Sequence, residues 1–357
     1  MPVSPKKIGV LTFHKCINYG SYWQARCLVE ALRARGHDAE LLDHDCRCVR
    51  RAEAHCALQP KLPERTPPKE LPRYRAKTRR FIDAIGRLPL SRRFSLHEPG
   101  TAGRYNSVVV GSDEVWNFRH PWYGSKPIFF GDGLNAGRLV SYGASFGNHS
   151  AHDGIDPAWA DKLARFAALS VRDENSRHLV RGGMGREAEL VLDPCLLHPP
   201  ANAGGEPDEE RPYAVVYGYG FPGWLKARVR EWARRSGMRL VSIGYSNDFA
   251  DEQRIGDGPL EFARRMAGAR AVITNFFHGC VFALLNGKPW ATVPSDYRSI
   301  KIPDLAAVLG AVDRLVHERT SERSFAELLD TPVKPHVEAR IGELRARSEA
   351  YLDAALS

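Results

Sequence analysis

Short apolar runs alternate with amphipathic stretches along most of the chain, and this alternation predicts strands connected by helices. Residues 7–13 (KIGVLTF) and 39–42 have the pattern of strands, and the amphipathic helix expected between them at 22–35 ends at Gly36. Further strands are predicted at 107–110, 138–145, 169–171 and 189–192, with a helix at 157–166. Such alternation indicates an α/β fold built on parallel sheets.

A second series of strands and helices follows a stretch without any apolar period. Residues 199–211 (PPANAGGEPDEER) are rich in Pro, Gly and acidic side chains and predict a linker. Beyond them, strands are expected at 213–217, 239–243, 271–274 and 289–293, and helices at 224–236, 259–268 and 276–286. We therefore predict an N-terminal Rossmann-like domain over 1–198, a C-terminal Rossmann-like domain over 212–335 and a terminal helix over 336–357.

A Pro-rich, irregular stretch at about 46–100 interrupts the first series, and we interpret it as an insertion with a helix at about 74–86. Between residues 61 and 93 there are eleven Lys or Arg against three Asp or Glu, which accounts for most of the net charge of +9. This excess of basic residues forms either a solvated helix face or a surface for an anionic partner, such as a membrane or a phosphorylated sugar carrier. Nucleic acid is not expected, because the segment lacks regular aromatic residues.

Composition places the protein in the cytoplasm, in our interpretation, with contact at the inner face of the membrane as an option. The sequence has no apolar run of the roughly 18–20 residues that a bilayer span needs. The seven cysteines are most simply reduced thiols. Cys46, Cys48 and Cys56 stand near His44 and His55, but the C-x-C spacing is not that of a standard zinc site, so no metal is predicted.

Candidate chemistry begins with residues 271–293, which predict a strand, a sharp turn, a helix and a second strand. Asn275 is the expected N-cap, and it leaves Phe276, Phe277 and His278 in the first helical turn. Unpaired amides and the helix dipole attract anions to such a turn. His278 is therefore either a catalytic group or a histidine with a local hydrogen bond.

Polar residues follow other predicted strands in the same way. Ser112 and Asp113 come directly after the strand at 107–110, where they form either a binding loop or a tight turn with a capping Asp. Arg172 stands at a strand-to-helix junction, and its planar fork suits a carboxylate or phosphate. The alternative is an ion pair between Arg172 and Asp173 or Glu174. No G-x-G-x-x-G follows the first strand, so a dinucleotide site is not indicated.

Several ordered motifs make the chain resemble the polysaccharide pyruvyl transferase family. They run from NYGS (18–21) through GSDEVWN (111–117), SYGASFG (141–147), LSVRDENS (169–176) and VLDPCLL (191–197) to residues 259–290 and 297–310. The resemblance implies two Rossmann-like domains facing each other across a cleft, as in GT-B glycosyltransferases. It also implies transfer of pyruvate from phosphoenolpyruvate to a sugar as a ketal, on a cell-surface or exopolysaccharide glycan or its precursor.

The resemblance also implies roles for individual residues. His278 matches the family's general acid/base, and Arg172 matches the arginine that contacts phosphoenolpyruvate. The donor site would further include Phe277, Gly279, Arg298 and Lys301. Residues expected to line the cleft or hold the acceptor are Asn18, Gly20, Ser21, Gly111, Ser112, Asp113 and Trp116. No metal or resident cofactor is implied, and phosphoenolpyruvate acts as a co-substrate.

One position departs from the family pattern. Many members have R-x-H where this chain has Phe276 two residues before His278, and we hypothesise that Arg298 or Lys301 offsets the lost charge. The saccharide acceptor could be lipid-linked, nucleotide-linked or polymeric. Two alternatives stay open from the sequence: a GT-B-like glycosyltransferase that uses a nucleotide sugar, and a non-catalytic relative that binds glycans.

Overall fold

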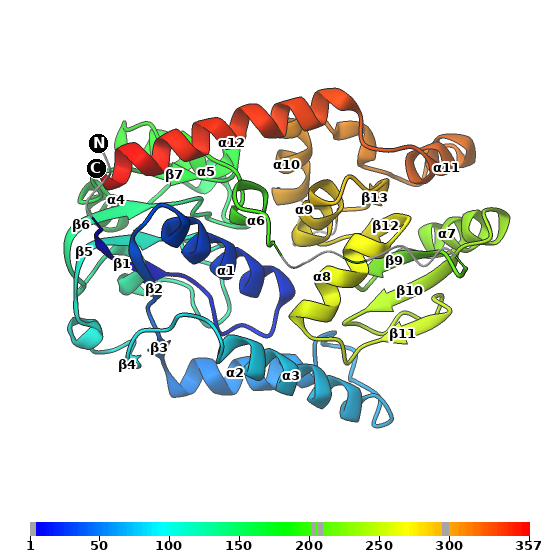
Figure 1. The fold of residues 1–357 in the computed structure, drawn as a ribbon, viewed down its shortest axis with the longest axis horizontal. Helices are drawn as coiled ribbons and strands as arrows, with labels where there is room; N and C mark the ends of the chain where they lie inside the picture. The colour runs from blue at the N-terminus through cyan, green and yellow to red at the C-terminus, as the bar shows by residue number, and fades with distance from the viewer. Residues whose placement is uncertain (1–4, 202–204, 206–209, 295–299) are drawn as a thin grey trace. The chain divides into compact units, whose positions relative to one another are not determined.

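The computed structural model describes residues 5–201, 205, 210–294 and 300–357. The chain forms two compact units (Figure 1). The first unit comprises Met1–Glu53, Ile85–Pro199 and Ile341–Ser357, and the second comprises Ala54–Ala84 and Pro200–Arg340. Each unit is an α/β structure around a parallel sheet.

The first unit is built on a four-stranded sheet in the order β2-β1-β5-β6. Its strands are β1 (Lys7–Leu11), β2 (Asp38–Leu41), β5 (Arg104–Val110) and β6 (Asn135–Ser141). All of its neighbouring strands are parallel, with Ile8 opposite Ala39 on one side and Ser107 on the other. Bridges continue the sheet from β6 towards β7 (Ser170–Val171), which pairs with β8 (Glu189–Leu190). A separate pair joins β3 (His44–Asp45) and β4 (Phe94–Ser95).

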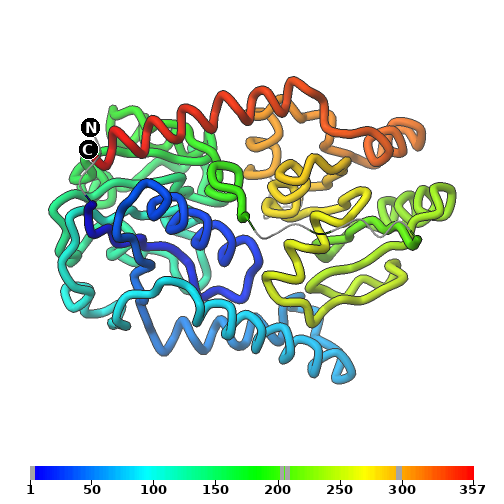
Figure 2. Tube along the Cα trace, viewed as in Figure 1, coloured from blue at the N-terminus to red at the C-terminus, as the bar shows by residue number. Residues whose placement is uncertain are grey.

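Helices follow the strands of the first unit, as the parallel sheet requires. They are α1 (Tyr19–Ala34), α2 (Arg47–Leu58), α4 (Pro157–Ala164), α5 (Glu174–Met184) and α6 (Pro194–Leu197). Helix α2 continues into the second unit. Short 3₁₀ turns are η1 (Pro99–Ala102), η2 (Pro127–Phe130) and η3 (Ala151–Asp153). Lys6 donates from Nζ to the carbonyl of Ser357 at 2.9 Å, so the start of β1 lies beside the chain's end (Figure 2).

The second unit is built on a five-stranded parallel sheet in the order β11-β10-β9-β12-β13. The strands are β9 (Tyr213–Tyr217), β10 (Arg239–Ile243), β11 (Glu252–Arg254), β12 (Ala271–Thr274) and β13 (Trp290–Thr292). Every residue of β9 and β12 is buried, as expected for central strands covered on both faces. Its core joins Val216 and Ile273 of these strands to Leu225, Trp232 and Phe325.

The helices of the second unit surround this sheet. They are α3 (Leu71–Ile85), α7 (Gly223–Arg235), α8 (Pro259–Gly268), α9 (Phe277–Leu285), α10 (Lys301–Leu309), the 3₁₀ turn η5 (Val312–Arg314) and α11 (Glu322–Asp330), and α12 (Pro335–Leu356) begins there. In the part of the chain that the structure describes, no helix combines the length and the apolar character needed to cross a bilayer. Helices α2 and α11 are additions to the elements predicted from the sequence.

The compact units divide the chain at points other than the predicted domain boundaries. The segment 54–84, predicted to belong to an insertion in the first domain, is part of the second unit. Hydrogen bonds of α3 explain this: Lys77 Nζ donates to Gly244 O at 3.1 Å and Arg80 Nη1 to Gly256 O at 2.9 Å. Helix α12 is likewise shared, because Ser348 Oγ accepts from Leu192 N at 2.9 Å, within the first unit.

Candidate active site

Each sheet has one place where the strand order reverses, and ligands of parallel α/β sheets bind at the carboxyl ends of the strands there. In the first unit this place lies between β1 and β5, and in the second between β9 and β12. The loops that leave these strands carry most of the residues predicted from the sequence.

The loop after β1 ends in a side-chain cap that fixes the start of α1. Asn18 Oδ1 accepts from Gly20 N at 2.8 Å and from Ser21 N at 3.3 Å. The helix begins at Tyr19, three residues earlier than predicted, so Gly20 and Ser21 lie in its first turn. Ser21 in turn donates from Oγ to Asp113 Oδ2 at 2.7 Å. The loops after β1 and β5 are therefore joined directly.

The loop after β5 has a backbone that only glycine accommodates at its first position. Gly111 has φ +116°, and a Cβ there would stand 2.3 Å from the carbonyl oxygen of Tyr142. Ser112 donates from Oγ to Gly143 O at 2.9 Å, and its own carbonyl accepts from Thr12 Oγ1 at 2.8 Å. Asp113 Oδ1 accepts from Glu114 N at 2.9 Å. Asp113 thus caps its own turn and also bonds across to another segment.

Arg172 joins the ends of three strands. Its Nη2 donates to Asp113 Oδ1 at 3.1 Å, and its Nη1 donates to Asp193 Oδ2 at 3.0 Å. The side chain is only 2% exposed. Burial would lower the pKa of this guanidinium, but the charges of Asp113 and Asp193 outweigh burial and raise it above its ordinary value. The result is a fixed, fully charged cation at this edge of the sheet.

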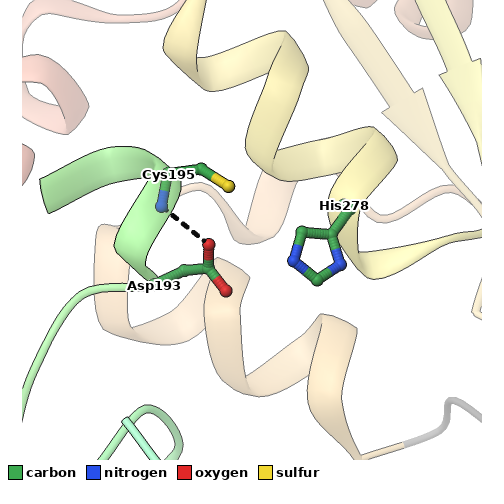
Figure 3. Close-up of side chains that lie close together, drawn as sticks. All are labelled: Asp193, Cys195 and His278. Carbon is green, nitrogen blue, oxygen red and sulfur yellow. Dashed lines mark hydrogen bonds between the residues drawn. The ribbon is translucent and has the colours of Figure 1, made fainter. Parts of the chain in front are cut away.

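The expected local alternative for Arg172, an ion pair with Asp173 or Glu174, is wrong. Asp173 is the N-cap of α5, where its Oδ1 accepts from Ser176 N at 2.7 Å. Asp193 has a similar structural bond, because its Oδ1 accepts from Cys195 N at 3.0 Å at the start of α6 (Figure 3). Two carboxylates therefore face one guanidinium.

Trp116 does not line a site and is a correction to the sequence interpretation. Its indole is fully buried, and Nε1 donates to Phe129 O at 2.9 Å. The ring packs against Phe130 and Phe146, with centroids 6.3 and 5.4 Å away. Trp116 supports the loop after β5 from within the core.

In the second unit, the turn between β12 and α9 differs from the prediction in its cap. Asn275 does not cap α9; its Nδ2 donates to Tyr219 O at 2.7 Å. The N-cap residue is Phe276, whose amide donates to Thr274 Oγ1 at 3.0 Å. The threonine at the end of the strand satisfies the amide, and the asparagine ties the turn to the loop after β9.

His278 lies in the first turn of α9, as predicted, and is 8% exposed (Figure 3). Its ring meets that of Phe277 edge to face, with centroids 5.2 Å apart. Gly279 permits the helix to approach β12, because a Cβ there would stand 2.0 Å from Thr274 Oγ1. Lys301 is the first residue of α10 and is 6% exposed, whereas Arg298 lies outside the described residues.

Phe276 belongs to an aromatic group that sequence reasoning missed. Its ring meets the rings of Tyr217, Tyr219 and Tyr245 at near right angles, with centroids 4.9, 5.6 and 5.2 Å away. The sequence did indicate this group, because tyrosines cluster at the end of β9 and just after β10. At the position where the resemblance implies an arginine, this chain has a 4% exposed ring packed among tyrosines.

Glu53 is a second residue missed from the sequence, because α2 was not predicted. Its Oε2 accepts from Ile17 N at 3.3 Å and its Oε1 from Trp122 Nε1 at 2.8 Å. Burial is the main cause that raises the pKa of this half-buried carboxyl, and the charge of Asp113 adds to it. Glu53 fixes the loop that leads to Asn18.

The fold defines a class. The chain is similar to the UDP-GlcNAc 2-epimerase from Neisseria meningitidis bound to UDP-GlcNAc, with TM-score 0.50, 9% identity, and 98% of this chain and 100% of that chain covered. It is equally similar to the Methanocaldococcus jannaschii UDP-GlcNAc 2-epimerase in complex with UDP-GlcNAc and UDP, with TM-score 0.50, 14% identity, and coverage of 97% and 99%. At these identities the likeness shows the fold alone, and that fold is GT-B-like, as predicted.

The family follows from the sequence model that the chain matches. A family model described as "Polysaccharide pyruvyl transferase" matches residues 18–297. The chain therefore belongs to the polysaccharide pyruvyl transferase family, which confirms the resemblance seen in its motifs. A search of curated proteins returned no match.

Proposed function

We propose that the protein transfers pyruvate from phosphoenolpyruvate to a saccharide, where it becomes a cyclic ketal. The observation that carries this proposal is the family match over residues 18–297, which covers the loops after β5, β9 and β12 and most of α1. In the reaction, the methylene carbon of phosphoenolpyruvate gains a proton and two neighbouring sugar hydroxyls bond to the carbon beside it. The hydroxyl protons leave, and the C–O bond to phosphate breaks to release inorganic phosphate.

His278 is proposed as the general acid/base. It stands in the first turn of α9, where helix amides and dipole favour an anionic substrate. An imidazole can deliver a proton to the methylene carbon and accept one from a sugar hydroxyl at neutral pH. Phe277, Gly279, Lys301 and Arg298 are proposed to complete the donor site. With Phe276 in an apolar group, positive charge for the phosphate must come from other residues.

The Ser21–Asp113 pair is proposed to orient the saccharide acceptor. Asp113 is 7% exposed, and a carboxylate accepts hydrogen bonds from sugar hydroxyls. Asn18, Gly20, Gly111 and Ser112 shape the two loops around that pair. Arg172 contact with phosphoenolpyruvate stays a prediction; the bonds of Arg172 to Asp113 and Asp193 support a positioning role for the same side chain.

The acceptor is proposed to be lipid-linked, nucleotide-linked or polymeric, and part of a cell-surface or exopolysaccharide glycan. Exposed basic residues on α3 support contact with an anionic membrane at its cytoplasmic face. Arg73, Arg75 and Arg79 are exposed there, and Ile82 on the same helix is 59% exposed. Basic side chains beside an exposed apolar one are typical of membrane-surface helices.

The proposal is tested by incubating the protein with phosphoenolpyruvate and a panel of saccharides, free and carrier-linked. We expect phosphate release that depends on one saccharide class, together with a pyruvate ketal on that saccharide by mass spectrometry. His278→Gln should abolish both signals, whereas the exposed control His317→Gln should not. Transfer of a sugar from a nucleotide sugar, without consumption of phosphoenolpyruvate, would replace the proposal with glycosyl transfer.

A further inference from the structure

A pocket of about 480 Å³ lies in the first unit where the start of α2 meets β3 and β4. Its lining combines two cysteines, a histidine and two arginines, and consists of Asp45, Cys46, Arg47, Cys48, Arg93, Phe94, Ser95 and His97. Pairing of His44 with Phe94 and of Asp45 with Ser95 holds the two sides of the pocket together. None of the residues proposed for catalysis or substrate binding lines it.

The two thiols in this pocket are in direct contact. The Sγ atoms of Cys46 and Cys48 stand 2.6 Å apart, and Cys46 Sγ is 3.7 Å from His97 Nε2. Cys46 is 8% exposed, whereas Cys48 is exposed. A disulfide holds its sulfurs about 2.05 Å apart, so joining these two requires little movement.

The surroundings of Cys46 favour its thiolate. Burial would raise the pKa of this thiol, but hydrogen bonds from Cys48, the Val49 amide and His97 outweigh burial and lower it to about 7. Cys46 directly precedes α2, a helix of 12 residues, whose first-turn amides and dipole also favour an anion. A thiolate at this position is the nucleophile in thiol–disulfide exchange.

From this geometry we propose that Cys46 and Cys48 form a redox-active dithiol that a small-molecule disulfide converts to an intramolecular disulfide. The Cys46 thiolate attacks one sulfur of the reagent, whose S–S bond breaks and releases one thiolate. Cys48 then loses its proton and attacks Cys46 Sγ, which displaces the second thiolate. Two electrons pass from the protein to the reagent, and the protein's two thiol protons end on the two released thiols.

A zinc site made from the same side chains fits the geometry less well. Cys46, Cys48 and His97 would supply three ligands. Two thiolates bound to one tetrahedral zinc at about 2.3 Å each stand about 3.8 Å apart. Sulfurs 2.6 Å apart would have to separate to bind one zinc, whereas they need to approach by only about 0.5 Å to form a disulfide.

The test uses the full-length protein in buffers of reduced and oxidised glutathione, followed by alkylation, trypsin and mass spectrometry. Arg47 stands between the two cysteines, so trypsin separates the peptides 36–47 and 48–50 when the thiols are reduced. We expect the two peptides to stay linked after oxidation and to separate on reduction. In Cys48→Ser, Cys46 should retain a glutathione adduct instead, and it should form about ten times faster than an adduct on Cys56.

Cys56→Ser is the matched control, because it leaves the pocket unchanged and should still yield linked peptides. Unlinked peptides at every glutathione ratio, with both cysteines open to alkylation, would overturn the proposal. It would equally be overturned by zinc that co-purifies with the protein, protects both thiols from glutathione and is lost in Cys46→Ser.

Discussion

At the scale of single residues, Gly279 shows how closely α9 is held against β12. We expect Gly279→Ala to lower the free energy of unfolding by about 2 kcal/mol, because its methyl group would meet Thr274 Oγ1 at 2.0 Å. Gly182→Ala is the matched control in α5, where a Cβ meets nothing within 4 Å. That change should stabilise the protein by up to about 1 kcal/mol. Urea unfolding compares the two, and equal effects would contradict the packing argument.

His44 makes the stability of the first unit depend on pH. Burial is the main cause that lowers the pKa of His44 to about 3, and His14 and Lys15 lower it further while Asp43 opposes them. The unfolded chain binds the His44 proton near pH 6.5, and the folded chain does not until about pH 3. Stability should therefore fall as the pH drops through this window, by about 1.4 kcal/mol per pH unit from this group.

Urea unfolding of His44→Gln at pH 7 and pH 5 checks this expectation. The amide of Gln can still donate to Thr12 O, which now accepts from His44 Nε2 at 2.9 Å, but it takes up no proton. The variant should lose less stability than the wild type on acidification. An unchanged loss would mean that groups other than His44 cause the pH dependence.

The local pattern placed His278 and Arg172 at the right junctions in the chain, but it did not show which distant residues they contact. His278 and Arg172 were found because they stand at strand-to-helix junctions. The partners of Arg172 were not found, because Asp113 and Asp193 lie 59 and 21 positions away. Trp116 was misassigned because a motif shows that a residue is characteristic of a family but does not show where its side chain points.

At the scale of elements, Arg172 connects the loop after β5, the end of β7 and the start of α6. Arg172→Ala should cost about 3–5 kcal/mol, because it leaves Asp113 and Asp193 buried without their cation. Arg181→Ala on α5 is the matched control, since its ion pair with Glu187 is largely exposed, at 67% and 65%. That change should cost well under about 1 kcal/mol by the same unfolding measurement. A similar small loss in both variants would refute the connecting role.

Elements with a strong apolar period were predicted well, and elements set by packing were not. The central strands β9 and β12 stand out as continuous apolar runs. Helix α2 (RCVRRAEAHCAL) has mostly polar residues, and only Val49 and Ala57 of this helix are buried. The Asn275 cap was wrong because its side chain bonds to Tyr219 O instead, and α9 begins one residue later, with Phe276 as its N-cap. N-cap propensity indicates which residues can cap a helix, but the hydrogen bonds of the folded chain decide which one does.

At the scale of the whole molecule, the basic face of α3 leads to a prediction about membranes. The protein should bind vesicles that contain anionic lipid, and binding should weaken as salt rises. Reversing charge at Arg73 and Arg79 should abolish sedimentation with vesicles, whereas Lys77, which is 3% exposed, contributes nothing to that face. Vesicle binding that does not depend on salt, or that persists after the charge reversal, would show that the basic face of α3 does not bind a membrane through charge.

The sequence predicted the fold class and the family, but it did not predict that segment 54–84 belongs to the second compact unit. Alternating strands and helices, with ordered motifs over residues 18–297, suffice for an α/β, GT-B-like member of the family. The placement of 54–84 depends on bonds such as Lys77 to Gly244, which join residues 167 positions apart. A local sequence pattern does not show which distant residues bond to each other.

The central claim is that phosphoenolpyruvate is the donor, and calorimetric titration of the purified protein tests it most directly. The account predicts saturable binding of phosphoenolpyruvate, with UDP and GDP titrated beside it as comparison ligands. Binding of a nucleotide, with none of phosphoenolpyruvate, would contradict the account and favour glycosyl transfer.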